Sequence, residues 1–163
     1  MATTKTKDAC DLLDADHKAV KKMFNEYEEL TEAKGNTREI REKRRALAEK
    51  ICNELMIHTQ IEEEIFYPAL RKPIKDDLLM NEAEVEHASA KDLIAQIQGM
   101  DISDPMFDAK VKVLGEYIDH HVKEERNEMF PKARSTKVDL VKLKDQLQMR
   151  KEELMAELEG VPA

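Results

Sequence analysis

Two stretches of the chain decide its fold, HTQIEEEIFYP at residues 58–68 and HHVKEERNEMFP at residues 120–131. Each stretch carries a histidine, a glutamate four residues later and a proline six residues after that, at His58, Glu62 and Pro68 and at His121, Glu125 and Pro131. Residues four apart lie on one face of an α-helix, with Cβ atoms about 5–6 Å apart. The repeat therefore predicts two matching helices, each of which holds an imidazole beside a carboxylate and ends at its proline.

Glycines and prolines divide the chain into five helical segments. Gly35 and Gly99 each follow a run of helical periodicity, and Asp104-Pro105 is typical of an N-cap followed by the first helical residue. The expected segments run from about 8 to 35, from 37 to 73, up to 99, from 104 to 131 and from 136 to 160. Because short connections imply antiparallel neighbours, we expect an all-α protein. It combines an up-down-up-down four-helix bundle over residues 8–134 with an additional C-terminal helix in residues 135–163.

The inner face of each bundle helix is apolar apart from one polar patch. Apolar residues recur with the 3.6-residue period on all four helices. One histidine interrupts each stripe and two stripes also contain a glutamate, at His17, His58, Glu62, His87, His121 and Glu125. A buried carboxylate without a partner costs several kcal/mol, and the stripes place no lysine or arginine beside the glutamates. A metal ion is the simplest compensation.

These six residues are the predicted ligands of a dinuclear metal site. One metal takes the imidazole of each His-Glu pair, while the carboxylate reaches a second metal about 3.5–4 Å away. The lone histidines His17 and His87 complete a pseudo-symmetric cage. Four imidazoles and two bridging carboxylates suit iron. Manganese and zinc accept the same donors, whereas nitrogen ligands disfavour magnesium and calcium.

The motifs are similar to those of a known family. Four of them stand together in this chain: Asp16-His17, HTQIEEEIFYP at 58–68, Glu86-His87 and HHVKEERNEMFP at 120–131. In this combination they resemble the hemerythrin-like family, also called the HHE cation-binding domain, over about residues 8–134. The resemblance implies a non-haem di-iron centre with two iron ions joined by an oxo or hydroxo bridge. It also implies a small oxidant as the partner, namely peroxide, dioxygen or nitric oxide.

One departure from the family pattern bears on function. In the oxygen-carrying hemerythrins that this chain resembles, the third helix carries two histidines in an HxxxH pattern. Here the residues four before and four after His87 are Ala83 and Lys91. One iron would have a histidine fewer and therefore an open position, as a catalytic metal needs. This favours peroxide decomposition, a catalase- or peroxidase-like activity, over reversible oxygen carriage. The alternative is an iron or oxygen/redox sensor, or an iron store, without catalytic turnover.

Three further residues are candidates for a supporting role. His120 lies about 100° round the helix from His121, which predicts a position at the surface or behind the ligands. Glu54 and Tyr117 each lie one turn before a motif histidine. They orient a ligand, replace the missing histidine, or line the pocket as partly exposed side chains. Other polar neighbours are interpreted as packing or solvated positions, among them Tyr67 and Glu63.

The composition narrows the range of partners. The 163 residues carry a net charge of −8, with 4% aromatic residues and no tryptophan, so phosphate backbones are repelled and few rings are available for base stacking. We therefore expect no nucleic acid as a partner. No apolar run approaches membrane-spanning length, and the N-terminal MATTKTKDAC has no hydrophobic signal region. We expect no membrane association and a cytoplasmic protein, with Cys10 and Cys52 as reduced thiols.

The C-terminal segment has its own pattern of leucines. Leu140, Leu147 and Leu154 recur at intervals of seven with Leu143 between them, but Arg150 interrupts the pattern. Fewer than three full heptads are too few to indicate a coiled coil. The stripe predicts packing against the bundle, with homodimer formation or binding of another partner through this helix as the alternative.

Overall fold

The computed structural model describes residues 7–33 and 35–160. Within these ranges the regular elements are helical and no strand occurs, which confirms the predicted all-α class. No described helix is both long enough and apolar enough to cross a bilayer. Residues 1–6, which form most of the N-terminal stretch without a hydrophobic signal region, lie outside the described residues. Residues 161–163, the end of the predicted C-terminal unit, lie outside them as well.

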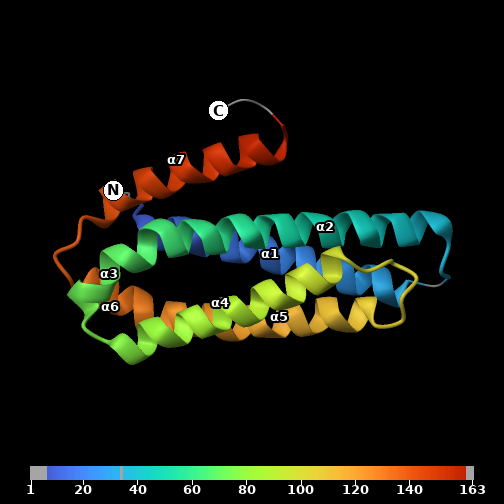
Figure 1. Cartoon of the computed structure of the whole chain (residues 1–163), viewed down its shortest axis with the longest axis horizontal. Coiled ribbons are helices and arrows are strands. Elements are labelled where there is room, and N and C mark those ends of the chain that lie inside the picture. The colour runs from blue at the N-terminus through green and yellow to red at the C-terminus, as the bar shows by residue number, and fades with distance from the viewer. Residues whose placement is uncertain (1–6, 34, 161–163) are drawn as a thin grey trace, which may run out of the picture.

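Four long antiparallel helices form the bundle (Figure 1). They are α1 (Ala9–Glu32), α2 (Arg38–Ile61), α4 (Asp77–Gln98) and α5 (Phe107–Glu124). Helix α1 packs against α2 and α5, and α4 packs against the same two helices. The predicted up-down-up-down bundle is therefore confirmed.

Aspartates cap the start of three helices, at Asp8, Asp76 and Asp139. The Asp8 carboxylate accepts a hydrogen bond from the Asp11 N–H at 3.0 Å, and the Asp11 carboxylate accepts one from the Asp8 N–H at 3.0 Å. This reciprocal capping box fixes the start of α1. Asp139 caps the C-terminal helix α7 (Leu140–Leu158), so this helix begins four residues later than the Thr136 start that the sequence predicts.

The predicted N-cap at Asp104 is wrong. Residues 102–106 form turns and α5 begins only at Phe107. The Asp104 side chain accepts a hydrogen bond from the Met106 N–H at 2.9 Å. Such a local side-chain contact competes with helix initiation, and the helix therefore begins after the turn.

Neither proline of the repeated motif ends its helix, so this expectation is also wrong. A π-helical turn follows α2 and α5, and each leads into a short helix. Helix α2 continues into η1 (Glu62–Phe66) and α3 (Tyr67–Ile74), and α5 continues into η2 (Glu125–Met129) and α6 (Phe130–Arg134). Proline lacks an N–H group and clashes with the carbonyl of residue i−4 inside an α-helix. The wider turns place Pro68 and Pro131 at the start of a new helical segment. Each π turn begins at a motif glutamate, and such turns are frequent at functional sites.

Two apolar clusters fill the bundle, one on each side of the layer that holds the histidines. One cluster includes Cys10, Leu13, Ile61, Phe66, Tyr67, Met80 and Phe130. The other includes Val20, Ile51, Cys52, Leu55, Ala90, Ile94 and Leu114. Both cysteines are free and buried, in agreement with the prediction of two separate thiols. The polar layer thus lies between two dry halves of the core.

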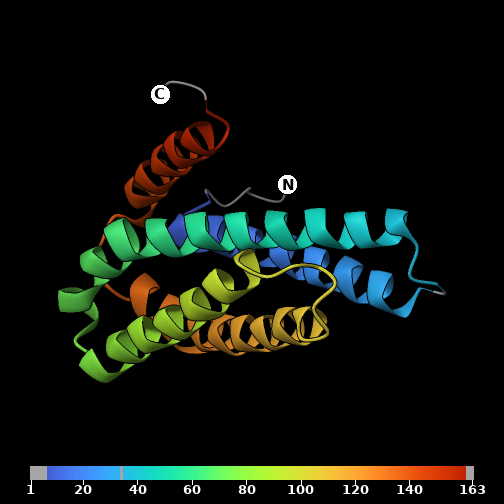
Figure 2. The ribbon, with the colours of Figure 1, turned by 45° about the vertical axis from the view of Figure 1, so that its right-hand side comes forward.

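The C-terminal helix lies across the α1 and α2 side of the bundle. Helix α7 contacts α1, α2 and η1 and crosses them at an angle (Figures 1 and 2). Four of its five leucines are buried in the first apolar cluster, at Leu140, Leu143, Leu147 and Leu154. The predicted packing of this stripe against the bundle is confirmed, whereas a homodimer through the helix stays a prediction.

Candidate metal centre

Four histidines meet in the polar layer, one from each bundle helix. His17, His58, His87 and His121 come from α1, α2, α4 and α5, and each is at most 6% exposed. They form two pairs. The Nε2 atoms of His17 and His58 lie 3.1 Å apart, and those of His87 and His121 lie 3.2 Å apart. In each pair the same ring nitrogens converge, as they would on a shared metal ion.

Glu62 connects the two histidine pairs. This fully buried side chain starts the π turn η1. Its Oε1 lies 2.6 Å from Nε2 of His58, on the same helical run, and 3.7 Å from Nε2 of His87, in the other pair. The carboxylate therefore faces both pairs at once.

Glu125 also connects the two histidine pairs, but it starts from the helical run of His121 and reaches His17. It starts the π turn η2 and is 1% exposed. Its Oε1 lies 2.8 Å from Nε2 of His121 and 3.4 Å from Nε2 of His17. The two glutamates thus repeat one arrangement, in which a carboxylate contacts one histidine of each pair.

The carboxylates have no hydrogen-bond partner among the described residues. Both oxygens of Glu62 and both oxygens of Glu125 are buried without one. Their close charged contacts within the described chain are with histidines, not with lysine or arginine. Buried carboxylates in this position need compensating positive charge. Because imidazole nitrogen and carboxylate oxygen are suitable donors for a transition metal, the residues fit a pair of cations.

Acidic side chains lie behind the histidines, on their Nδ1 atoms. The distances from Nδ1 are 3.2 Å for His58 to Asp16, 3.0 Å for His87 to Glu63 and 3.2 Å for His121 to Glu86. An Nδ1–H that donates to a carboxylate fixes the tautomer that leaves Nε2 free for a metal. His17 has a longer contact, with Nδ1 3.5 Å from Oδ1 of Asp14.

None of these acidic residues is predicted from the sequence to support a histidine. Glu63 does not simply lie on a solvated face, as predicted, because it contacts His87 and also Lys91, whose Nζ lies 2.6 Å from its Oε1. A signal was present for three of them, since each is the immediate neighbour of a predicted ligand. Asp16 and Glu86 precede a histidine, and Glu63 follows Glu62.

The charges of the two glutamates help to raise the pKa values of two histidines. Burial lowers the pKa of His58, but the charges of Glu62 and Glu125 and the contact with Asp16 together outweigh burial and raise this pKa to about 10. The charges of Glu125 and Glu62 and the contact with Glu86 together likewise raise the pKa of His121 against burial. Burial alone would raise the pKa of Glu125, yet the charge of His121 and the contacts with His121 and His17 together hold it well below its usual range. A cation that enters the site must displace the protons of both histidines.

Tyr67 places its hydroxyl oxygen inside the site. Its Oη lies 3.1 Å from Nε2 of His87 and 3.1 Å from Nε2 of His121, and the residue is 4% exposed. The predicted packing of Tyr67 is confirmed for its ring, which belongs to the first apolar cluster, and the hydroxyl contacts two candidate ligands in addition. The hydroxyl lies beside the pair that includes His87, whose helix has Ala83 where a second histidine would stand.

The three supporting candidates lie outside the ligand cluster. The His120 side chain is 69% exposed, and its Nε2 lies 3.4 Å from Oε2 of Glu86, the carboxylate behind His121. Tyr117 is about half exposed and lines a cavity beside the histidines. Glu54 is partly buried and has no hydrogen bond or ion pair with the described residues of the cluster. The supporting roles of these residues stay predictions.

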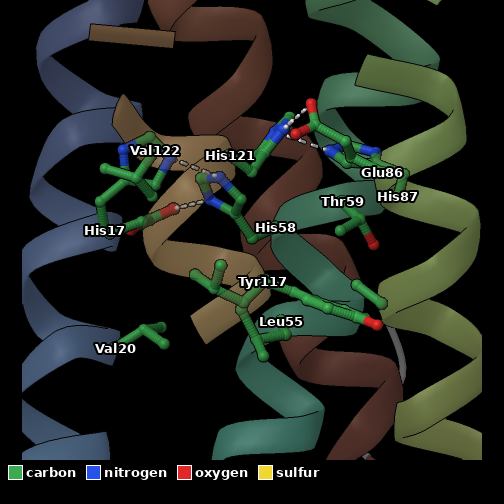
Figure 3. Close-up of a pocket in the computed structure, with 13 residues that line it drawn as sticks. His17, Val20, Leu55, His58, Thr59, Glu86, His87, Tyr117, His121 and Val122 are labelled. Atoms are coloured by element: carbon green, nitrogen blue, oxygen red, sulfur yellow. Dashed lines mark hydrogen bonds and ion pairs between the residues drawn. The ribbon is translucent and has the colours of Figure 1, made fainter. Parts of the chain in front are cut away.

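A small cavity adjoins the histidines (Figure 3). Its volume is about 20 Å³, which is room for about one water-sized molecule. The polar part of its wall includes the four histidines, Asp16 and Glu86. The rest is largely apolar, with Val20, Leu55, Ala90, Ile118 and Val122. Only a very small ligand fits beside the candidate ligands.

Comparison with known proteins agrees with this geometry. The family model of the hemerythrin HHE cation binding domain matches residues 8–133. The chain belongs to the hemerythrin HHE family. It is similar to the crystal structure of a hemerythrin HHE cation binding domain-containing protein, the Rv2633c homologue from Mycobacterium kansasii. The TM-score is 0.73 and the sequence identity 25%, over 93% of this chain and 89% of that chain. No curated protein matches the chain.

The two comparisons extend over different parts of this HHE protein. The family match ends at residue 133, before α7 begins. The structural match covers 93% of the chain and therefore reaches into α7. Cation binding is the property that the family name carries, and the paired histidines with their buried glutamates supply the donors for it in this chain.

Proposed function

We propose that this HHE protein holds two iron ions and decomposes hydrogen peroxide. The observation that carries the proposal is the pair of buried carboxylates, each in contact with one histidine of each pair and otherwise without a partner in the described part of the chain. One ion would be held by His17 and His58 and the other by His87 and His121, with Glu62 and Glu125 bridging them and an oxo or hydroxo bridge between the ions. Manganese or zinc would use the same donors.

The Tyr67 hydroxyl supports a further contact to the ion held by His87 and His121. It lies equally close to the Nε2 atoms of both. Burial, together with the charges of Glu125 and Glu62, raises the pKa of Tyr67 well above its ordinary value. A bound cation would lower the pKa of Tyr67 instead, because positive charge favours the phenolate. We assign Tyr67, rather than Glu54 or Tyr117, to the position that the missing histidine leaves.

The cavity supports a small oxidant as the substrate. A cavity of about 20 Å³ excludes large ligands, which favours the smallest oxidants, namely peroxide, dioxygen and nitric oxide. Bound iron would supply the redox chemistry by which two molecules of peroxide give two of water and one of dioxygen. The chain would hold the ions at a fixed separation, orient the imidazoles through their Nδ1 contacts, and keep bulk water out with the apolar wall.

Metal analysis of protein from iron-replete cells tests the proposal. We expect about two iron ions per chain, since two bridging carboxylates hold two metals. The oxidised protein should show oxo-to-iron charge transfer in the near-ultraviolet and no electron paramagnetic resonance signal. Adding peroxide should release dioxygen over many turnovers. One metal per chain with a mononuclear high-spin ferric signal would contradict the dinuclear site.

A matched pair of variants separates the site from its surroundings. Glu62→Gln removes a bridging charge and should lower both iron content and dioxygen release. Glu116→Gln changes an exposed residue of α5 that forms no ion pair with described residues, and it should retain both. Two iron ions without sustained dioxygen release would instead identify the alternative, a sensor or an iron store.

A further inference from the structure

Each of the four histidines is backed by an acidic residue that in turn contacts a basic side chain. The four series are His17, Asp14 and Arg126; His58, Asp16 and Lys151; His87, Glu63 and Lys91; and His121, Glu86 and His120. Three basic residues belong to the bundle and its π turns. Lys151 belongs to α7, which lies outside the four-helix bundle. The C-terminal helix therefore reaches one of the candidate ligands through a single intervening carboxylate.

The contacts of Lys151 are short and shielded from solvent. Its Nζ lies 2.6 Å from Oδ1 of Asp16, and Oδ2 of Asp16 lies 3.2 Å from Nδ1 of His58. The side chains of Lys151 and Asp16 are only 21% and 15% exposed. We propose that Lys151 is a positioning residue of the metal centre, which holds Asp16 in place and thereby sets how strongly His58 donates to its metal. This inference rests on the metal site proposed above.

The charge of Lys151 has a defined effect on the histidine. An Asp16 carboxylate without Lys151 would attract the Nδ1 proton of His58 more strongly and make its Nε2 a better electron donor. A better donor favours the ferric ion over the ferrous ion. Lys151 therefore holds the reduction potential of the centre higher than Asp16 alone would. Since Lys151 belongs to α7, the docking of this helix and the potential of the centre are linked.

Helix α7 has other contacts that keep it docked. Leu143, Leu147 and Leu154 are buried in the first apolar cluster, and Arg150 Nε lies 2.8 Å from Oε2 of Glu64. Lys151→Met removes the charge but keeps the length of the side chain, so we expect the helix to stay in place.

The test compares metal-loaded full-length variants by reduction potential and by the rate of iron loss to a chelator. Lys151→Met should lower the potential, because the charge of Asp16 is no longer neutralised. It should also accelerate iron loss, because Asp16 is no longer held in place to orient His58, and Lys151→Arg should restore both. Asp16→Asn removes the carboxylate charge and should raise the potential, while it accelerates iron loss by about 10-fold. Lys142→Met is the matched control, because Lys142 is exposed on the same helix and forms no ion pair with described residues. It should behave as wild type.

Opposite shifts of the potential in Lys151→Met and Asp16→Asn distinguish an electrostatic role from loss of packing. Shifts of the same sign, or equal values in Lys151→Met and Lys142→Met, would overturn the proposal. The function proposed above fails separately, if wild type takes up no iron. In that case the rate of zinc loss from zinc-loaded protein decides the role of Lys151. Faster loss from Lys151→Met than from Lys142→Met supports it, and equal rates overturn it.

Discussion

At the scale of single residues, the adjacent histidines of α5 have different surroundings. His121 is buried with its Nε2 2.8 Å from Glu125, whereas His120 is largely exposed and contacts Glu86. His121→Ala should weaken iron binding by about 10-fold or more, because a ligand is lost. His120→Ala should keep nearly full iron content. Iron analysis of both variants checks this, and the reverse result would mean that the inward face of α5, and Glu125 with it, is wrongly assigned.

The hydroxyl of Tyr67 gives a second prediction at this scale. Tyr67→Phe keeps the buried ring and should therefore retain most of the iron, but it should remove any visible absorption due to phenolate-to-ferric charge transfer. Tyr27→Phe is the matched control, since the Tyr27 hydroxyl donates to Oδ1 of Asp108 at 2.6 Å, away from the cluster. Visible spectra of the two iron-loaded variants decide the point. Identical spectra in wild type and both variants would remove Tyr67 from the ligand set.

At the scale of helices, the start of α1 depends on Asp8. The Asp8 carboxylate caps the helix and accepts from Arg134 Nε at 3.1 Å. Burial raises the pKa of Asp8, but the hydrogen bonds from Arg134 and Asp11 outweigh it and lower this pKa below 3.8. Because the folded pKa lies below the unfolded one, the stabilisation is present above the unfolded value and is lost as the pH falls through the folded value.

Removal of Asp8 should therefore cost stability in a pH-dependent way. Asp8→Ala should lower the free energy of unfolding by about 1 kcal/mol at neutral pH, and by less once the solution is more acidic than the folded pKa. Urea unfolding of wild type and Asp8→Ala, once at neutral pH and once below the folded pKa of Asp8, measures the difference in free energy of unfolding at each pH. Equal differences at the two values would show that the Asp8 charge contributes nothing.

The helices could be predicted from the sequence, but their irregular turns could not. The 3.6-residue period and the positions of glycine and proline indicate each long helix, as at Gly99, which follows the last residue of α4. A π turn moves a hydrogen bond from residue i−4 to i−5 over five residues, and this leaves no trace in the apolar spacing. Pro68 and Pro131 are read as helix ends for that reason, although the wider turns accommodate them.

At the scale of the whole molecule, the inner and outer parts of the site differ in how far the sequence predicts them. A histidine or glutamate on an otherwise apolar stripe is easily recognised in the sequence, and this pattern identifies all six candidate ligands. The carboxylates behind the histidines do not stand out, because 35 residues of the chain are Asp or Glu and these lie on partly exposed flanks. The contact of Lys151 with Asp16 depends on how α7 crosses the bundle, which leucine spacing does not define.

Metal binding and pH act on the whole molecule through the buried histidines. Without metal, the pKa of His58 is raised from 6.5 to about 10, because the charges of Glu62 and Glu125 and the contact with Asp16 together outweigh the opposing effect of burial. The pKa of His121 is also raised. Because the folded pKa of His58 exceeds the unfolded one, the stability from its proton is fully present below 6.5 and is lost as the pH rises through about 10.

A metal ion takes an imidazole only after its proton has left, so metal and protons compete for the same two side chains. Titrating iron at neutral pH into protein stripped by a chelator should release about two protons per chain, one each from His58 and His121. His121→Ala should release about one fewer, whereas His120→Ala should match wild type. For the same reason, the difference in melting temperature between loaded and stripped protein should widen as the pH rises from neutral towards the pKa of His58. A difference that stays constant over this range, measured by calorimetry, would show that these histidines are not the ligands.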